Sequence, residues 1–259
     1  MTTTATQVRS DRSLAGGSDA VLRLDGVCIA FGGLKVLRDV SFTVLQREVV
    51  GLIGPNGAGK STCFNVITSV CRPDAGEVLL QGARITRMRP DRVCRRGVAR
   101  TFQLVRTFQR MTALQNVLVG AVYGHRRGPE NVDEVALEML DLVGLTQQKD
   151  RSAAHMTLSD RRLLEIARAL ASRPAVVLLD EPMAGLNGIE IEQMVSVIRR
   201  IRDERGVSVL WVEHKVDAIM TVCDRVVVLD HGEKIADGTP AEVIANPKVI
   251  EAYLGDPAA

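Results

Sequence analysis

Apolar residues along the chain follow two alternating patterns: short continuous runs, and longer stretches in which they recur three or four positions apart. The short runs are bounded by turn residues, so they predict strands. Four lie between residues 21 and 54, and the others are EVLLQG (77–82), VVLLD (176–180), VSVLWV (207–212) and RVVVLD (225–230). The helical spacing predicts helices at 60–70, 132–143, 163–170 and 189–204. A capping box, Thr239-Pro240-Ala241-Glu242, predicts the start of a last helix.

The alternation of strands and helices favours a parallel sheet with helices on its faces. Composition supports this fold class, because 46% of the residues are hydrophobic and only 3% are aromatic. The core must therefore be mainly aliphatic, as in strands that are buried on both faces. We expect an α/β protein built around one main sheet.

Several classes of protein are excluded by the same survey. No apolar run approaches the roughly 20 residues that a membrane-spanning helix needs, and residues 1–19 lack the apolar stretch of a secretory signal, so they are expected to form a disordered leader. The five cysteines are odd in number and contain no Cys-x-x-Cys pair, which favours reduced thiols. The net charge of +2 is too small to indicate a polyanionic partner.

A glycine-rich segment between a predicted strand and a predicted helix matches the pattern G-x-x-x-x-G-K-[ST]. Such a loop turns backbone N–H groups towards phosphate oxygens, and the helix N-terminus adds its dipole. Within it, Lys60 is expected to reach the β- and γ-phosphates of a nucleotide and Ser61 to hold Mg²⁺. The candidate binding residues are Gly54, Pro55, Asn56, Gly57, Ala58, Gly59, Lys60, Ser61 and Thr62.

The other half of such a site is an acid at the end of a buried strand, and VVLLD followed by Glu181 supplies it. Asp180 is expected to bind the metal through water, and Glu181 to act on the attacking water as a general base or orienting group. A GTPase would carry Asn-Lys-x-Asp to read guanine. The nearest match, His214-Lys215-Val216-Asp217, lacks the Asn, so a GTPase is not expected.

Several further segments resemble the ATP-binding subunits of ABC transporters, and specifically those of branched-chain amino-acid importers. The similarity extends over about residues 21–256. The segments that carry it are FGGLKVLRDVSF (31–42), GVARTFQ (97–103), MTALQNVLVG (111–120), EPMAGLN (181–187), VEHKVDAIM (212–220) and GTPAEVIANPKVIEAYLG (238–255). The resemblance implies a P-loop core with an N-terminal antiparallel β-subdomain and an α-helical subdomain inserted at about 101–165, the whole cassette spanning 20–256.

The resemblance also implies roles for single residues at an ATP·Mg²⁺ site. Phe31 matches the aromatic residue that stacks on adenine, and Gln103 matches the glutamine that reaches the metal and the water. His214 matches the histidine that contacts the γ-phosphate. The implied catalytic residues are Glu181, His214 and Gln103, and the implied metal-binding residues are Ser61, Gln103 and Asp180.

The chain departs from the family in the signature Leu-Ser-x-Gly-Gln, which closes over the ATP of the opposite subunit. Counting back nine residues from Ile166 places Thr157 at the signature serine. Ser159 then replaces the glycine and Asp160 the glutamine. A Cβ at position 159 is expected to hinder close approach to a phosphate and to penalise positive φ. The carboxylate of Asp160 is expected to repel the γ-phosphate by about 1 kcal/mol when hydrated.

The loop, the Asp180-Glu181 pair and His214 match the family, so we expect this chain to bind ATP·Mg²⁺. We expect the altered signature to weaken the site that holds the partner's nucleotide. One weakened composite site would result in a heterodimer, and two in a homodimer. The implied partners are transmembrane permease subunits, a second ATPase subunit and, indirectly, an extracytoplasmic solute-binding protein, with this chain at the cytoplasmic face of the membrane. The sequence leaves the solute open between branched-chain amino acids and urea or amides.

Two alternatives from other classes remain. One is a nucleotide-binding regulatory subunit that hydrolyses poorly, which the altered signature favours. The other is a soluble ABC ATPase acting on nucleic acid or ribosomes, and the chain lacks the second cassette or coiled-coil insertion usual in that class. The segment 84–110 holds nine arginines against one acid, Asp91. This charge suits docking to a membrane subunit or anionic lipid, and a solvated surface explains it equally well. Nucleic acid is not expected as a partner, because aromatic rings and a known reader motif are lacking.

Overall fold

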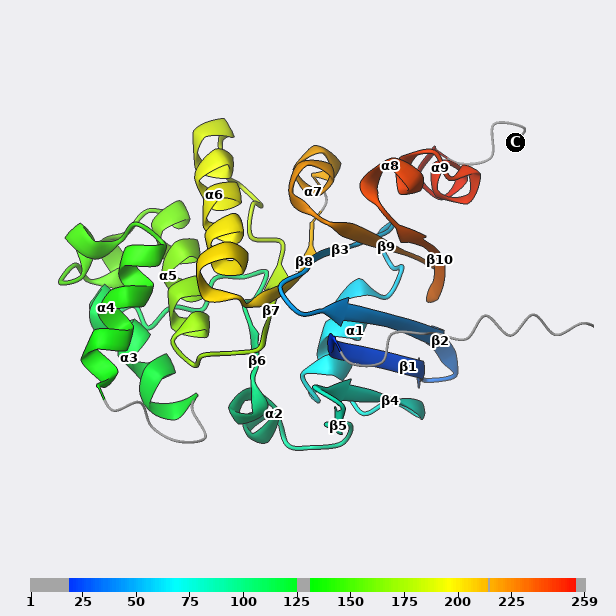
Figure 1. Cartoon of the computed structure of the whole chain (residues 1–259), viewed down its shortest axis with the longest axis horizontal. Coiled ribbons are helices and arrows are strands. Elements are labelled where there is room, and N and C mark those ends of the chain that lie inside the picture. Colours follow the sequence, from blue (N-terminus) through cyan, green and yellow to red (C-terminus); the bar gives the residue numbers. More distant parts are fainter. Residues whose placement is uncertain (1–18, 125–130, 214, 255–259) are drawn as a thin grey trace, which may run out of the picture.

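The computed structural model describes residues 19–124, 131–213 and 215–254 of the 259-residue chain, arranged as two sheets with helices around them (Figure 1). The first sheet is antiparallel, in the order β2-β1-β4-β5. Its strands are β1 (Ala20–Phe31), β2 (Leu34–Leu45), β4 (Ala75–Leu80) and β5 (Ala83–Arg84). This sheet matches the antiparallel portion that the resemblance implies near the N-terminus.

Strand β1 is continuous where the apolar pattern predicted two separate strands. Its pairing with β2 shifts register between Leu24 and Val27, and Gly26 in that interval has φ +60°. Such an irregularity bends a strand without ending it. The predicted break in the apolar run is therefore a bulge.

The second sheet has six strands in the order β10-β9-β3-β8-β7-β6 and is parallel except at β10. All five residues of β3, of β7 and of β8 are buried, as expected for a parallel sheet covered on both faces. The strands are β3 (Val49–Ile53), β6 (Val98–Arg100), β7 (Val176–Asp180), β8 (Ser208–Val212), β9 (Arg225–Asp230) and β10 (Glu233–Gly238).

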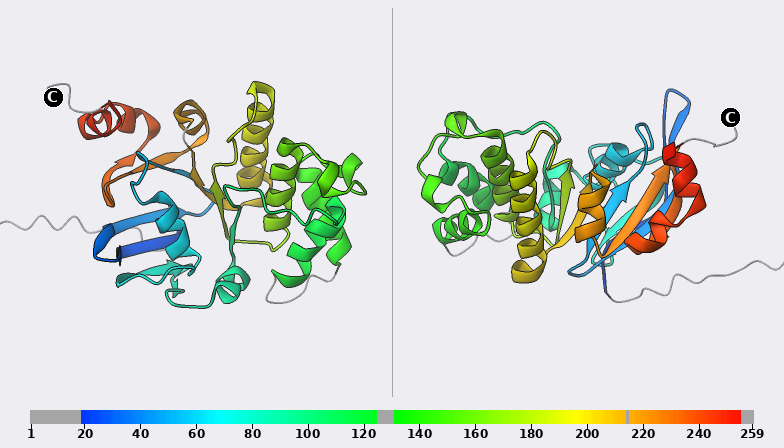
Figure 2. Two further views of the ribbon diagram at one scale, coloured as in Figure 1. Left: turned by 180° about the vertical axis from the view of Figure 1, so that it is seen from behind. Right: turned by 90° about the horizontal axis from the view of Figure 1, so that it is seen from above.

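The helices divide into a group packed on one another and a group packed on the sheets. Helices α3, α4 and α5 form the first group, which lies to one side of the six-stranded sheet (Figures 1 and 2). The helices are α1 (Lys60–Ile67), α2 (Pro90–Arg96), α3 (Ala113–Tyr123), α4 (Val132–Leu142), α5 (Leu158–Leu170), α6 (Gly188–Arg205), α7 (Val216–Val222), α8 (Pro240–Ile244) and α9 (Pro247–Leu254). The limits expected for the helical subdomain and for the whole cassette stay predictions.

Two hydrophobic clusters hold these layers together. One lies between the two sheets and is filled by α1, with Phe64 fully buried against residues such as Leu22 and Leu52. The other lies under α3–α6 and includes Val117, Leu164 and Trp211. In the described parts of the chain, no helix is both long and apolar enough to cross a membrane.

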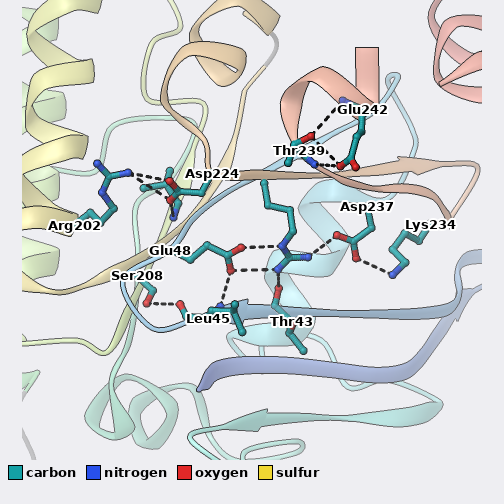
Figure 3. Close-up of polar contacts among 12 residues, drawn as sticks. Thr43, Leu45, Glu48, Arg202, Ser208, Asp224, Lys234, Asp237, Thr239 and Glu242 are labelled. Atoms are coloured by element: carbon teal, nitrogen blue, oxygen red, sulfur yellow. Dashed lines mark hydrogen bonds and ion pairs between the residues drawn. The ribbon is translucent and has the colours of Figure 1, made fainter. Parts of the chain in front are cut away.

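Arg225, the first residue of β9, ties the two sheets together at the amino-terminal ends of the parallel strands. Its Nε donates to Oε1 of Glu48 at 2.8 Å, and its two other nitrogens donate to Asp237 and to the carbonyl oxygen of Thr43. Thr43, Glu48 and Asp237 reach this point from three different segments of the chain (Figure 3). The Arg225 side chain is only 20% exposed.

We expect Arg225→Met to lower the free energy of unfolding by about 1–3 kcal/mol, because it removes hydrogen bonds in which a charged guanidinium takes part and deprives the half-buried carboxylate of Glu48 of this partner. Chemical denaturation would measure the loss. As a matched control, Arg84→Met breaks the exposed pair between Arg84 and Glu77, which is worth about 0–1 kcal/mol. Equal losses in the two variants would contradict the structural role of Arg225.

Candidate nucleotide-binding site

The glycine-rich loop connects β3 to α1, and its backbone conformation explains why glycine is required. Gly54 has φ +150°, and a Cβ on it would lie 2.0 Å from the carbonyl oxygen of Leu229. Gly59 caps α1 with φ +102°, and a Cβ there would lie 2.7 Å from a methyl of Leu37. These close approaches fix a loop that opens onto the N-terminus of α1, where N–H groups can face phosphate oxygens.

Lys60 is the first residue of α1 and is held inside the loop. Its side chain is buried, and Nζ donates to the carbonyl oxygens of Gly54 at 2.6 Å and Pro55 at 2.9 Å. Burial lowers the pKa of Lys60, while the nearby carboxylates of Glu181 and Asp180 oppose that shift. The lysine thus lies within electrostatic range of both predicted acids.

Both predicted acids lie at the carboxyl end of β7, two strands away from the loop in the sheet. Asp180 is buried, and its N–H donates to the hydroxyl of Thr101 at 3.2 Å. Glu181 has φ +48°, and its N–H donates to the carbonyl oxygen of Val212. A left-handed conformation in a residue other than glycine is typical of functional sites, where the surrounding structure must hold it.

Gln103 contacts Glu181 directly. Its side-chain Nε2 donates to Oε2 of Glu181 at 3.0 Å, although 78 residues separate the two in sequence. Gln103 follows β6, which lies beside β7 at the edge of the sheet. The fold thus brings together two of the residues that sequence reasoning placed in the site.

Arg162 on α5 contributes to the same region and was not among the predicted site residues. Its Nη1 donates to the carbonyl oxygen of Glu181 at 3.0 Å and its Nη2 to that of Ala184 at 2.7 Å. Both acceptors are backbone groups, so Arg162 holds the turn that carries Glu181. No local sequence pattern signals such a contact, because its partners are distant in the chain.

The altered signature lies at the N-terminus of α5. Thr157 caps the helix, with its hydroxyl accepting from the N–H of Asp160 at 3.1 Å. Ser159 is buried in the first turn and is absent from the positive-φ residues. The expected penalty for positive φ at position 159 is therefore wrong, since helical backbone suits serine. The Oδ1 of Asp160 accepts from Gln148 at 3.3 Å.

Phe31 and His214 are the residues implied to contact the adenine and the γ-phosphate. The Phe31 ring ends β1 and is 49% exposed, so it is accessible to a ligand. His214 lies outside the described residues. It directly follows Glu213, which is buried and accepts from the N–H of Met183 at 2.8 Å.

The residues present fit Mg²⁺ bound together with a nucleotide. Among the described residues, no group of three His, Cys, Asp or Glu side chains could hold a metal alone. The candidate donors are the hydroxyl of Ser61, the amide oxygen of Gln103 and the carboxylate of Asp180. Mg²⁺ favours a few such oxygen ligands completed by phosphates and water.

Comparison with known families agrees with this geometry. Residues 37–184 match the family described as ABC transporter, and residues 233–259 match the family described as branched-chain amino acid ATP-binding cassette transporter. The chain therefore belongs to the ABC transporter family as one of its ATP-binding cassettes, an ATPase coupled to transport. The predicted family and enzyme class are confirmed.

Its relatives carry more specific names. It is 39% identical over 254 residues to the high-affinity branched-chain amino acid transport ATP-binding protein BraF of Pseudomonas aeruginosa, covering 92% of this chain and 99% of that protein. It is 36% identical over 253 residues to the high-affinity branched-chain amino acid transport ATP-binding protein LivG of Escherichia coli K12, with the same coverage.

Solved structures confirm the predicted fold class. A nucleotide-free ATP-binding cassette from an ABC transporter matches with a TM-score of 0.83 and 31% identity, covering 92% of this chain and all of that chain. The ADP conformation of an ATP-binding cassette of an ABC transporter also matches with a TM-score of 0.83 and 31% identity, covering 92% of this chain and 99% of that chain.

Proposed function

We propose that this chain hydrolyses ATP at an interface with a second ATPase subunit and thereby drives uptake of branched-chain amino acids through separate membrane subunits. The observation that carries the proposal is the contact between Gln103 and Glu181 within electrostatic range of Lys60. It assembles a phosphate-binding cation, a candidate base and a polar group that can orient water.

In this proposal each residue acts on a different part of the reaction. Lys60 and the N–H groups of the loop bind the β- and γ-phosphates, and Phe31 stacks on the adenine. Glu181 accepts a proton from the attacking water, which Gln103 and His214 help to orient. Ser61, Gln103 and Asp180 would hold Mg²⁺, which when bound neutralises phosphate charge.

A groove between the sheet and the helical group suits a cytoplasmic helix of a membrane subunit. Its volume is about 680 Å³. Apolar side chains line it together with four arginines and two acids, Asp91 and Glu165, and the exposed Phe108 ring lies against the guanidinium of Arg168, 5.2 Å from the ring centroid. This combination favours an apolar helix carrying an acidic side chain. The lining includes Val98, Phe102, Phe108, Val119, Tyr123, Arg95, Arg106 and Arg168.

The proposed solute rests on the names of the relatives. Both BraF and LivG are named as branched-chain amino acid transport ATP-binding proteins. The C-terminal family match, which covers β10, α8 and α9, carries the same solute in its description. We place this chain at the cytoplasmic face of the membrane, bound to its permease subunits.

Affinity purification from membranes tests the partnership. We expect a tagged chain to purify with two kinds of subunit, a membrane permease and an ATPase, and to show ATPase activity that rises with a loaded amino-acid receptor. Purification with ribosomes or nucleic acid instead of permease subunits would contradict the proposal. The same ATPase assay with a receptor loaded with urea or an amide tests which solute the transporter takes up.

We propose further that the altered signature weakens the composite site that holds the partner's ATP. Ser159→Gly combined with Asp160→Gln is expected to raise turnover of the assembled complex by about fivefold, which corresponds to removing about 1 kcal/mol of repulsion. Steady-state ATPase assays would measure the change. Unchanged turnover in the assembled complex would contradict this proposal.

A further inference from the structure

Arg100 differs from the other arginines of the 84–110 segment because its side chain is largely covered and lies beside the nucleotide site. Its side chain is 10% exposed, whereas the other eight arginines are exposed at the surface. Those eight arginines therefore belong to a solvated surface, and Arg100 does not. Burying a guanidinium is costly unless it is paired and hydrogen-bonded, so its partners must be identified.

The guanidinium of Arg100 joins the two halves of the nucleotide site. Nη2 donates to Oδ2 of Asp180 at 2.8 Å, and Nη1 donates to Oδ1 of Asn65 at 2.7 Å. Asn65 lies on α1, five residues after Lys60. One side chain thus links the helix that follows the phosphate loop to the acid that ends β7.

Two aromatic rings fix the plane of this guanidinium. Its central carbon lies 5.4 Å from the centroid of Phe64 and 5.3 Å from that of Phe102. Contacts of this kind are attractive and limit the rotation of the planar group. Arg100 is therefore preorganised before any ligand arrives.

Asp180 is held at two points by adjacent residues of one segment. Thr101 accepts from its N–H, and Arg100 binds Oδ2 of its side chain. Oδ1 accepts no hydrogen bond from the part of the chain that the structure describes. Among the described residues, Arg100 therefore occupies only one of the two carboxylate oxygens of Asp180.

We propose that Arg100 is a positioning residue for the Mg²⁺ site, which acts by holding Oδ2 of Asp180 so that Oδ1 is directed at the metal of the nucleotide. This inference rests on the proposed function, because it takes Asp180 as the acid that serves Mg²⁺. Groups that orient a metal-binding carboxylate typically change metal affinity by about 10–100-fold when they are removed.

The positive charge of Arg100 by itself would lower the affinity for Mg²⁺, because it repels the cation. The proposal therefore requires that orienting Asp180 raises the Mg²⁺ affinity by more than this repulsion lowers it. Arg100→Lys separates the two effects, since lysine keeps the charge and cannot bind Asp180 and Asn65 in one planar fork. Arg100→Met removes both the charge and the fork.

Binding of a fluorescent ATP analogue to the full chain, titrated with Mg²⁺ and repeated in EDTA, tests the proposal. In both Arg100→Met and Arg100→Lys we expect the Mg²⁺ concentration for half-maximal enhancement of binding to rise about 10–100-fold. Nucleotide affinity in EDTA should stay unchanged, which also shows that the variants fold. Arg84→Met, which removes an exposed arginine paired with Glu77, serves as the matched control and should titrate like the unmodified chain.

Each other outcome overturns a defined part of the account. Variants that titrate like the unmodified chain, or tighter Mg²⁺ binding in Arg100→Met, would overturn the positioning role. A normal titration for Arg100→Lys alone would show that only charge matters, which also overturns it. If Mg²⁺ does not enhance binding to the unmodified chain, the metal site of the proposed function fails as well.

Discussion

Glu181→Gln is expected to lower ATP turnover of the assembled complex by about 10²–10⁴-fold, the usual contribution of a general base. The amide has the same size as the carboxylate, so packing at the end of β7 should be preserved. It cannot accept a proton from water, which is the property that the proposed reaction uses. Steady-state ATPase assays measure the loss, and equilibrium binding of ATP should remain unchanged.

The same substitution separates the hydrolytic subunit from the regulatory alternative. A chain that only binds nucleotide to regulate its partner would show nearly the same turnover after Glu181→Gln. Glu192→Gln is the matched control, because Glu192 is exposed on α6 and should leave turnover unchanged. Equal activities in the two variants would reject Glu181 as the base.

Lys60→Ala is expected to weaken ATP binding by about 10–100-fold, because a hydrogen bond to a charged group is worth about 1.5–3 kcal/mol. The ammonium is already held inside the loop by the carbonyl oxygens of Gly54 and Pro55. It therefore needs little rearrangement to reach a phosphate. Calorimetric or fluorescence titration with ATP measures the change.

An exposed lysine provides the control for this second prediction. Lys149→Ala removes an ammonium from the surface and should leave ATP affinity unchanged. If Lys60→Ala binds ATP like the unmodified chain, the loop between β3 and α1 is not the phosphate site. A loss of affinity in both variants would indicate a general effect of charge.

The nucleotide loop could be predicted because its chemistry is local. The residues from Gly54 to Thr62 are consecutive, and each glycine meets a constraint of the turn itself. The acid pair Asp180-Glu181 also follows one apolar run directly. Patterns of this kind can be recognised in the sequence because all their residues belong to a single turn or strand end.

Arg100 and Arg162 could not be predicted, because their partners come from distant parts of the chain. Arg100 contacts residues 35 and 80 positions away, and Arg162 contacts backbone groups 19 and 22 positions away. In the sequence, Arg100 is one arginine among nine in its segment. Burial alone separates it from the others, and this burial depends on the pairing of β6 with β7 in the sheet.

The fold shows the same contrast between local and distant determinants. The long apolar runs of β7, β8 and β9 predicted strands correctly. Strand β6 has only three residues, too few for a recognisable period, and it exists because β7 offers a free edge. At position 159 the family pattern suggested backbone strain, yet the capping of α5 by Thr157 places Ser159 in an ordinary helical turn.

Uptake of labelled leucine by vesicles containing the complete transporter tests the central claim most directly. With ATP inside the compartment that holds this chain and loaded receptor on the other side, we predict uptake that depends on ATP and Mg²⁺. Glu181→Gln should abolish this uptake while the complex remains assembled, and Glu192→Gln should not affect it. Full uptake by the assembled Glu181→Gln complex would contradict the claim that hydrolysis at this site drives transport.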